Sequence, residues 1–192
     1  MTAPDAQAEE KRRRFEEVAL PFLRAIHTVA WRLTHDAEES RDLVQETYLR
    51  AYRTFDAFRA GTNCKAWLLT ILYSIFVNRY RKKRRQPLAI SIEELEKQFP
   101  SRLESAGPSD RLSGRLWSDR EVEEALAALP EDFRAAVLLV DIEELSYEEA
   151  ATALACPVGT VRSRLFRARK ALFVALQDYA RRAGYREPTG MP

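Results

Sequence analysis

A chain of 192 residues is long enough for one medium-sized domain or two small ones. Its composition, 46% hydrophobic and 31% charged, supports folded cores and excludes a chain that is disordered throughout. The net charge of only +2 hides an uneven distribution, because residues 1–88 and 150–192 each carry six more basic than acidic residues, whereas residues 89–149 carry ten more acidic than basic ones. Two basic blocks around an acidic one indicate two contacts with a polyanion.

The first basic block begins with two amphipathic helices. Apolar residues recur at helical spacing from Phe15 to Leu33, where Pro21 can introduce a local kink. Residues 36–58 give a second amphipathic segment, and Asp36 is placed to cap its N-terminus. No alternation of apolar and polar residues is long enough to predict a strand here or elsewhere in the chain.

A third helix follows a break at Gly61. Either Thr62 or Asn63 can cap it, and its pattern continues to about Arg84. Its end carries six positive side chains within the seven residues 79–85. Such a run is often only a solvated helix end, but aromatic residues beside cations are also what single-stranded DNA requires, since bases stack on the rings and phosphates bind the charges. We expect most of the aromatic residues to be core, Trp67 and Phe76 included.

Residues 89–118 are rich in Ser, Gly, Pro and acidic residues, which predicts a linker. Helical periodicity then resumes, stops at Pro130, and continues through two further segments to Leu154. The expected fold is therefore all-α, with two small helical domains joined by a flexible linker. In chain order we expect an N-terminal tail (1–14), a helical bundle (15–88), the linker (89–118), a helix-turn-helix domain (119–184) and a C-terminal tail (185–192).

The stretch 145–172 has the pattern of a helix-turn-helix. Ser146 and Glu149 form a capping box for a short helix, "ACPVG" supplies the turn, and a second helix begins at Val158. The second helix carries five cations and no acid up to Leu172, which suits a helix seated in the DNA major groove. An ordinary Arg-rich surface helix is the alternative interpretation.

The cysteines and histidines do not indicate a metal site or a redox centre. Cys64 and Cys156 are isolated, and His27 and His35 are not spaced near them as metal ligands would be, so we interpret the cysteines as buried or half-buried thiols. The first residues are polar where a signal peptide needs an apolar core. The longest apolar stretch is far short of the about 20 residues of a membrane span. We expect a soluble cytoplasmic protein with no cofactor.

Three stretches together closely resemble bacterial RNA polymerase sigma factors of the extracytoplasmic-function (ECF) group. They are "SRDLVQETYLRAYRTFDAF", "WLLTILYSIFVNRYRKKRR" and "LPEDFRAAVLLVDIEELSYEEAATALACPVGTVRSRLFRAR", in the family order. The resemblance covers about residues 15–88 and 119–175. It implies a factor that binds core polymerase, directs it to promoters through the −35 and −10 elements, and promotes DNA opening.

The resemblance also implies which residues contact each partner. The clamp helices of the polymerase's largest subunit would bind Asp42, Gln45, Glu46, Leu49 and Arg50. The −10 element would be recognised and opened by Asn63, Lys65, Trp67, Ser74, Asn78, Arg79, Tyr80, Arg81, Lys82, Lys83, Arg84 and Arg85. The −35 element would contact Thr160, Arg162, Ser163, Arg164, Phe166, Arg167 and Lys170.

Further features of the resemblance concern specificity and regulation. Related proteins often carry Asn where this chain has Ser74, near a pocket for a flipped −10 base, whereas Asn78 is retained. The polymerase's β flap is a second expected contact, and an anti-sigma factor is an expected partner. The "GTNxKAW" and "NxYRKK" details look most like the subgroup regulated by zinc-containing, thiol-based anti-sigma proteins.

Two other functions are compatible with parts of the sequence. A dimeric helix-turn-helix repressor or activator would explain the second block and predicts tight binding to a palindromic duplex. A nucleic-acid-processing enzyme would need a catalytic constellation, and the sequence shows no phosphate-binding glycine loop, metal cluster or nucleophile–base pair. We therefore expect no catalysis by this chain itself.

Overall fold

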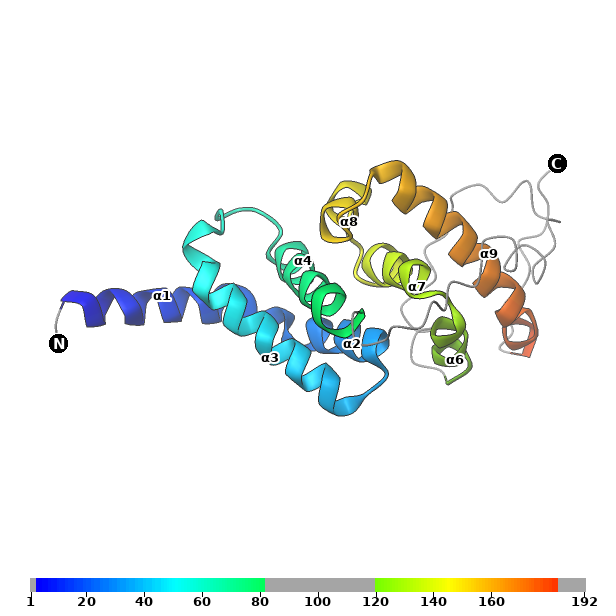
Figure 1. Cartoon of the computed structure of the whole chain (residues 1–192), viewed down its shortest axis with the longest axis horizontal. Helices are drawn as coiled ribbons and strands as arrows, with labels where there is room; N and C mark the ends of the chain where they lie inside the picture. The colour runs from blue at the N-terminus through cyan, green and yellow to red at the C-terminus, as the bar shows by residue number, and fades with distance from the viewer. Residues whose placement is uncertain (1–2, 82–119, 183–192) are drawn as a thin grey trace. The chain divides into compact units, whose positions relative to one another are not determined.

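The computed structural model describes residues 3–81 and 120–182 (Figure 1). Over these residues the chain is helical and contains no strand, which confirms the predicted all-α class. The α-helices are α1 (Ala3–Ala19), α2 (Leu23–Thr34), α3 (Ala37–Thr54), α4 (Cys64–Phe76), α6 (Arg120–Ala128), α7 (Glu131–Val137), α8 (Tyr147–Ala153) and α9 (Val158–Arg182). Short 3₁₀ turns occur at Leu20–Phe22 and Phe55–Ala57, and π-helical turns at Val77–Arg81 (η3) and Leu138–Ile142 (η5).

The described helices group into two compact units. The first contains α1 to α4 together with residues 145–158, which hold α8. The second contains α6, α7, η5 and the part of α9 from Gly159 onward. The helix-turn-helix domain expected from the sequence therefore contributes α8 to the first unit. The predicted linker 89–118 lies outside the described residues.

In the first unit, α3 packs against both α2 and α4. The buried side chains include Ile26, Leu33, Leu43, Leu68 and Leu72, each almost fully removed from solvent. Such complete burial of leucine and isoleucine is the main stabilising contribution of this unit, at about 1.5–3 kcal/mol per side chain. The 3₁₀ turn Leu20–Phe22 interrupts the helix at Pro21, the position where the sequence allows a local kink.

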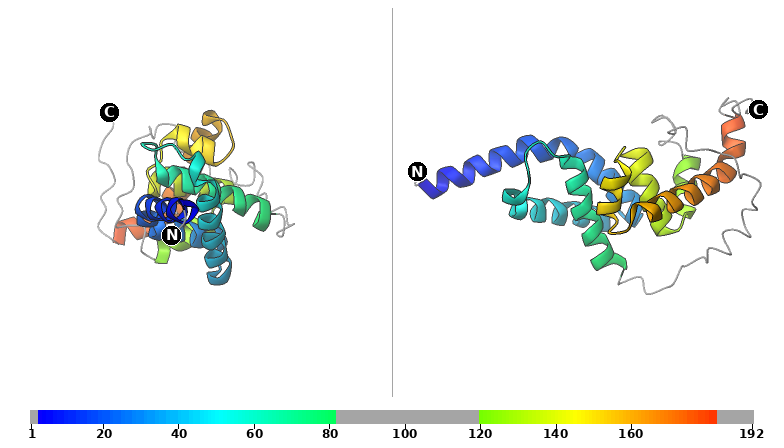
Figure 2. Two further views of the ribbon diagram at one scale, coloured as in Figure 1. Left: turned by 90° about the vertical axis from the view of Figure 1, so that its left-hand side faces the viewer. Right: turned by 90° about the horizontal axis from the view of Figure 1, so that it is seen from above.

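A cluster of aromatic rings joins α1 to the end of α3. Phe15 contacts the rings of Tyr48, Tyr52 and Phe55 edge to face, with centroids 5.2–6.2 Å apart. Such contacts contribute about 0.5–1.5 kcal/mol each beyond the area that they bury. Because α1 begins at Ala3, residues 3–14, expected as a tail, are helical; α1 extends past the other helices of the unit (Figure 2).

The second unit is built around the apolar faces of α6, α7 and α9. Val122 and Leu126 of α6 are buried, as are Val161 and Leu165 of α9. The buried Arg134 of α7 donates from Nη1 to the Ala127 carbonyl at 3.1 Å, which satisfies a carbonyl at the end of α6. The apolar side of α9 is buried in this unit, and Arg162, Ser163 and Phe166 on its other side are exposed.

Candidate nucleic-acid interface

The predicted polymerase-binding residues lie on α3, a helix with one buried face. Leu43, Thr47 and Ala51 are fully buried, as their four-residue spacing predicts. The five predicted contact residues project from the other side. Asp42, Gln45, Leu49 and Arg50 are exposed and Glu46 is half-buried. The exposed fraction of Leu49 is 50%.

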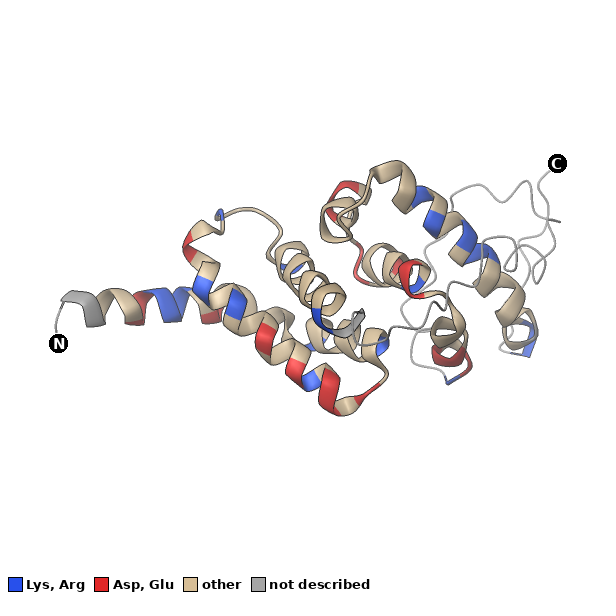
Figure 3. Cartoon of the chain, in the orientation of Figure 1, with Lys and Arg blue, Asp and Glu red and all other residues tan. Residues whose placement is uncertain are grey.

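The charges along α3 are unevenly distributed. Its acids, Glu38, Glu39, Asp42 and Glu46, all precede its last two turns and have Arg41 among them, whereas the charged residues of those last turns, Arg50 and Arg53, are both basic (Figure 3). This order suits the helix dipole, because acids near the N-terminus and bases near the C-terminus are both favourable. It also gives the exposed face an acidic end and a basic end.

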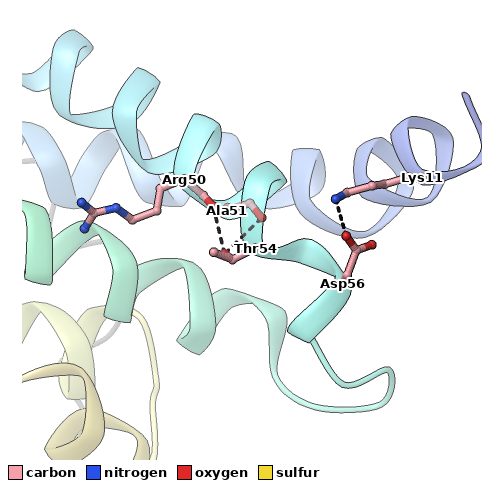
Figure 4. A network of polar contacts seen from close by, with 5 residues as sticks. All are labelled: Lys11, Arg50, Ala51, Thr54 and Asp56. Carbon is pink, nitrogen blue, oxygen red and sulfur yellow. Dashed lines mark hydrogen bonds and ion pairs between the residues drawn. The ribbon is translucent and has the colours of Figure 1, made fainter. Parts of the chain in front are cut away.

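The basic end of α3 is fixed by local contacts. Thr54 donates to the Arg50 carbonyl at 2.9 Å, and Lys11 of α1 forms an ion pair with Asp56 at 2.6 Å (Figure 4). The Arg50 side chain extends away from these contacts (Figure 4). The carbonyl group of Arg50 therefore accepts a hydrogen bond from Thr54, while the Arg50 residue is exposed to solvent.

The loop before α4 turns at Gly61, whose φ of +86° lies in the left-handed region that glycine adopts without strain. Asn63 follows as the N-cap of α4, and its side-chain oxygen accepts from the Ala66 N–H at 3.1 Å. Of the two caps that the sequence allowed, Asn63 is the one used. Lys65 is half-buried.

The aromatic residues of α4 divide between the core and the surface. Phe76 is buried, as expected, and so is Tyr73. Trp67 is half-buried and packs against Phe58, with ring centroids 4.9 Å apart. Burial removes Tyr73 and Phe76 as stacking platforms for bases and leaves Trp67 as the partly accessible ring of this helix.

Ser74, near the C-terminal end of α4, and Asn78, just after it, are both exposed. Asn78 already belongs to the π-helical turn η3, as do the predicted DNA-binding residues Arg79, Tyr80 and Arg81. The rest of the basic run, Lys82, Lys83, Arg84 and Arg85, lies outside the described residues.

One ion pair joins two of the predicted sites. Arg79 donates through Nη1 to the Oε2 atom of Glu46, so a predicted DNA contact is paired with a predicted polymerase contact. The residues are 33 positions apart in the chain. The sequence shows only that the two residues have opposite charges, which is true of many other pairs in the chain. This ion pair therefore could not be predicted from the sequence.

The helix-turn-helix residues adopt the expected local structure. The capping box of α8 is complete, with Ser146 Oγ accepting from Glu149 N–H at 3.1 Å and Glu149 Oε2 accepting from Ser146 N–H at 2.8 Å. Ala155, in the turn, has a φ of +50°. Along one side of α9, Val161, Leu165, Ala168 and Leu172 are buried and Val158 is half-buried.

The outward side of α9 carries the predicted −35 contacts. Arg162, Ser163 and Phe166 are exposed, and Phe166 shows 52% of its surface. Thr160, Arg167 and Lys170 are half-buried.

Two of the cations between Val158 and Leu172 form ion pairs with acids of their own unit. Arg164 forms an ion pair with Asp132 of α7 at 2.9 Å. Arg169 forms two bonds, at 2.5 and 3.1 Å, with the carboxylate of Asp141 in η5. Arg164 was a predicted DNA contact, and its guanidinium group already has an acidic partner. These two ion pairs connect α9 to α7 and to η5.

Burial raises the pKa of the Cys64 thiol to about 11. Burial and the neighbouring Cys64 raise the pKa of Tyr48 to about 12. At pH 8 only about one Cys64 thiol in a thousand would be ionised, and the thiolate is the reactive form. These values agree with the interpretation of Cys64 as a buried structural thiol.

Iodoacetamide at pH 8 is therefore expected to modify the half-buried Cys156 at least about tenfold faster than Cys64. Because the pKa of Cys64 is raised in the folded state, the stabilisation from its protonated form is complete below about pH 8.5 and is lost as the pH rises toward 11. Peptide mass spectrometry would measure the two alkylation rates. Equal rates in the folded chain would contradict the assignment, and the urea-unfolded chain is the control in which they should converge.

Within residues 3–81 and 120–182, no group of three or more His, Cys, Asp and Glu side chains is arranged to hold a metal ion. Nor is any helix in these ranges long and apolar enough to cross a membrane.

Comparison with known proteins identifies the family of this chain. The family model of sigma-70 region 2 matches residues 20–86, and that of sigma-70 region 4 matches residues 119–172. The RNA polymerase sigma-H factor of Pseudomonas aeruginosa is 35% identical over 90% of this chain and 91% of its own length. The ECF RNA polymerase sigma factor EcfG of Rhodopseudomonas palustris is 40% identical over 82% of this chain and 81% of its own.

A solved structure shares both fold and sequence. The sigma factor RpoE from Bartonella quintana, in complex with the anti-sigma factor NepR, is 32% identical, with a TM-score of 0.64 over 85% of this chain and 97% of the other. Sigma factors are not enzymes; they bind core RNA polymerase in the cell interior and recognise the −10 and −35 elements through regions 2 and 4. The two region matches and the extent of identity to these relatives show that this chain belongs to the sigma-70 family of RNA polymerase sigma factors, in its ECF group.

Proposed function

We propose that this sigma factor divides its three contacts among three helices. The exposed face of α3 binds the clamp helices of core polymerase, the loop before α4 and the exposed end of that helix bind the −10 element, and the outer side of α9 binds the −35 element. The observation that carries the proposal is the burial pattern. On α3 and α9 the buried residues recur at helical spacing, and most of the predicted contacts keep exposure to solvent.

Opening of the −10 element would depend on differential binding, because the sequence shows no phosphate-binding glycine loop for a nucleotide whose hydrolysis could supply free energy. Flipping a base out of the duplex costs a few kcal/mol. Capture of an unpaired base on an aromatic ring returns about 1–3 kcal/mol. Among the described −10 residues, the partly accessible Trp67 would stack on an unpaired base, and the exposed Ser74 and Asn78 would form hydrogen bonds with it. Contacts within the polymerase would supply the remainder.

The proposal is tested by purification of the full chain from a native lysate with core polymerase, followed by run-off transcription. A sigma factor requires both association and promoter-dependent transcripts. A dimeric helix-turn-helix repressor would instead bind a palindromic duplex without polymerase. Tight binding to such a site, with no association with core polymerase, would favour that second function.

We also propose that an anti-sigma factor in the cytoplasm controls this chain. The support is the 32% identity to a sigma factor solved with the anti-sigma factor NepR. The exposed Leu49 and the surrounding charges of α3 would then serve polymerase and anti-sigma factor in turn. Control by a zinc-containing, thiol-based protein stays a prediction from the sequence.

Charge reversal at Glu46 tests the polymerase contact. Glu46→Lys is expected to weaken holoenzyme assembly by about tenfold or more, because like charges brought together at an interface cost several kcal/mol. Thermal stability should change little, since the ion pair that Glu46 forms is largely exposed and such pairs contribute about 0–1 kcal/mol. Competition with the wild-type chain for core polymerase would measure assembly. Glu17→Lys, an equal charge change on an exposed position of α1, is the control. Equal assembly by the two variants would contradict the contact.

A further inference from the structure

The ion pair between Glu46 and Arg79 connects residues that the proposed function assigns to different partners. Glu46 projects from α3, the proposed polymerase-binding helix. Arg79 is the first cation of the basic run assigned to DNA phosphates. Both side chains retain solvent contact, with exposed fractions of 35% for Glu46 and 54% for Arg79. An incoming partner can therefore reach either member of the pair.

The helix geometry around Arg79 brings it to α3. Val77–Arg81 form a π-helical turn, in which hydrogen bonds span five residues instead of four. One added residue rotates the following side chains by about 100° relative to a continuous α-helix. The direction of Arg79 therefore depends on this turn, and π-helical turns are frequent at functional sites.

The surroundings of Glu46 make it a natural contact for a cationic partner. Asp42 lies one turn before it on the same side of α3, and Glu38 lies one turn before Asp42. A basic surface that binds this acidic row would compete with Arg79 for the Glu46 carboxylate. A DNA phosphate would compete with Glu46 for the Arg79 guanidinium group.

We propose that the Glu46–Arg79 pair couples polymerase binding to DNA binding by an exchange of partners. In the free chain Glu46 occupies Arg79 and lowers its contribution to DNA binding. When polymerase takes Glu46, Arg79 is released to bind phosphate. The inference rests on the proposed function. Coupling between two binding sites is reciprocal, so DNA that binds Arg79 makes Glu46 more available to polymerase by the same factor.

The size of the coupling is limited by the strength of one exposed ion pair. Such pairs correspond to a factor of about 1.5 to 5 in an equilibrium constant at low salt. The effect should decrease as the salt concentration rises, because the pair is screened.

A double-mutant cycle on the full-length free chain tests the exchange. The affinity for a fluorescein-labelled single-stranded oligonucleotide is measured at low salt for the wild type, Glu46→Gln, Arg79→Gln and the double variant. Asp42→Asn is the matched control, because it removes the same charge one turn away on the same helix. Glu46→Gln is expected to tighten binding about 1.5- to 5-fold more than Asp42→Asn does. This difference should vanish when Arg79 is replaced.

The same oligonucleotide is then measured with holoenzyme formed at saturating core polymerase. Arg79→Gln should now weaken binding of the otherwise wild-type holoenzyme by the factor that it shows in the free Glu46→Gln chain. Equal effects of Glu46→Gln and Asp42→Asn, or a difference that persists without Arg79, would overturn the exchange while leaving the proposed function intact. If none of the chains binds the oligonucleotide, free or in holoenzyme, the proposed −10 contact fails together with the exchange.

Discussion

Replacement of Arg169 with methionine is expected to lower the free energy of unfolding by about 3 kcal/mol. Arg169 donates two hydrogen bonds to Asp141, whose side chain is only 2% exposed. Methionine keeps much of the volume of the arginine stem but removes the guanidinium group. The carboxylate of Asp141 would remain buried without its counter-charge, and loss of one partner from a buried ion pair typically costs about 3–5 kcal/mol. The 33% exposure of Arg169 places the expected value at the lower end.

Chemical denaturation followed by helical circular dichroism measures this change. Arg182→Met is the matched control, because Arg182 lies on the same helix and pairs with Glu121 at 2.8 Å, but with both side chains largely exposed. That control should lose less than about 1 kcal/mol. The double variant Arg169→Met with Asp141→Leu should recover much of the loss, since it removes the buried charge as well. Equal losses for Arg169→Met and Arg182→Met would show that burial of Asp141 carries no special cost.

Local capping signals predicted several helix boundaries well. Asp36 caps α3, with its side chain accepting from the backbone N–H groups of Glu38 and Glu39 at 2.9 and 2.8 Å. Ser146 and Glu149 form the predicted capping box, and α6 stops before Pro130. These features are legible in a sequence because each involves residues within four positions of one another.

The ends of the chain were harder to predict. Helix α1 begins at Ala3, and its later part is held by Phe15, which packs on three rings of α3 and of the 3₁₀ turn that follows, and by Lys11, which pairs with Asp56. These contacts are distant in sequence, so a polar N-terminal segment looked like a tail. The two π-helical turns, η3 and η5, were not predicted either. No residue pattern marks an i to i+5 hydrogen bond in advance of packing.

The sequence indicated which residues belong to the candidate sites, but it did not indicate which of their charged side chains form ion pairs. The resemblance assigns Glu46, Arg79 and Arg164 to contacts with polymerase or DNA, and all three keep some exposure to solvent. It could not show that an acid on another helix lies opposite each cation. Glu46 and Asp132 come from segments about 30 residues away from their partners, as their separations of 33 and 32 positions record. The number of cations in the sequence therefore overestimates the positive charge available to bind DNA, because Arg79 and Arg164 are paired with acids.

Replacement of Arg167 with alanine is expected to weaken promoter binding by about 1–3 kcal/mol and to relax preference at one position of the −35 element. Arg167 lies near the exposed Ser163 and Phe166 on α9. An arginine there can bind guanine through two hydrogen bonds, and loss of such a contact removes discrimination at that base pair. Binding of holoenzyme to a set of −35 sequences that differ at single positions measures the change.

Arg164→Ala is the matched control for this prediction. It removes the same charge from the same helix three residues earlier, but its guanidinium group is held by Asp132 with both side chains only 20–27% exposed. The control should therefore lower stability and weaken all −35 variants to a similar degree, without a change in base preference. Uniform weakening by Arg167→Ala would instead mark Arg167 as a phosphate contact. If only Arg164→Ala changed the base preference, Arg164 would have to leave Asp132 when DNA binds. Arg164, and not Arg167, would then be the arginine that recognises the base.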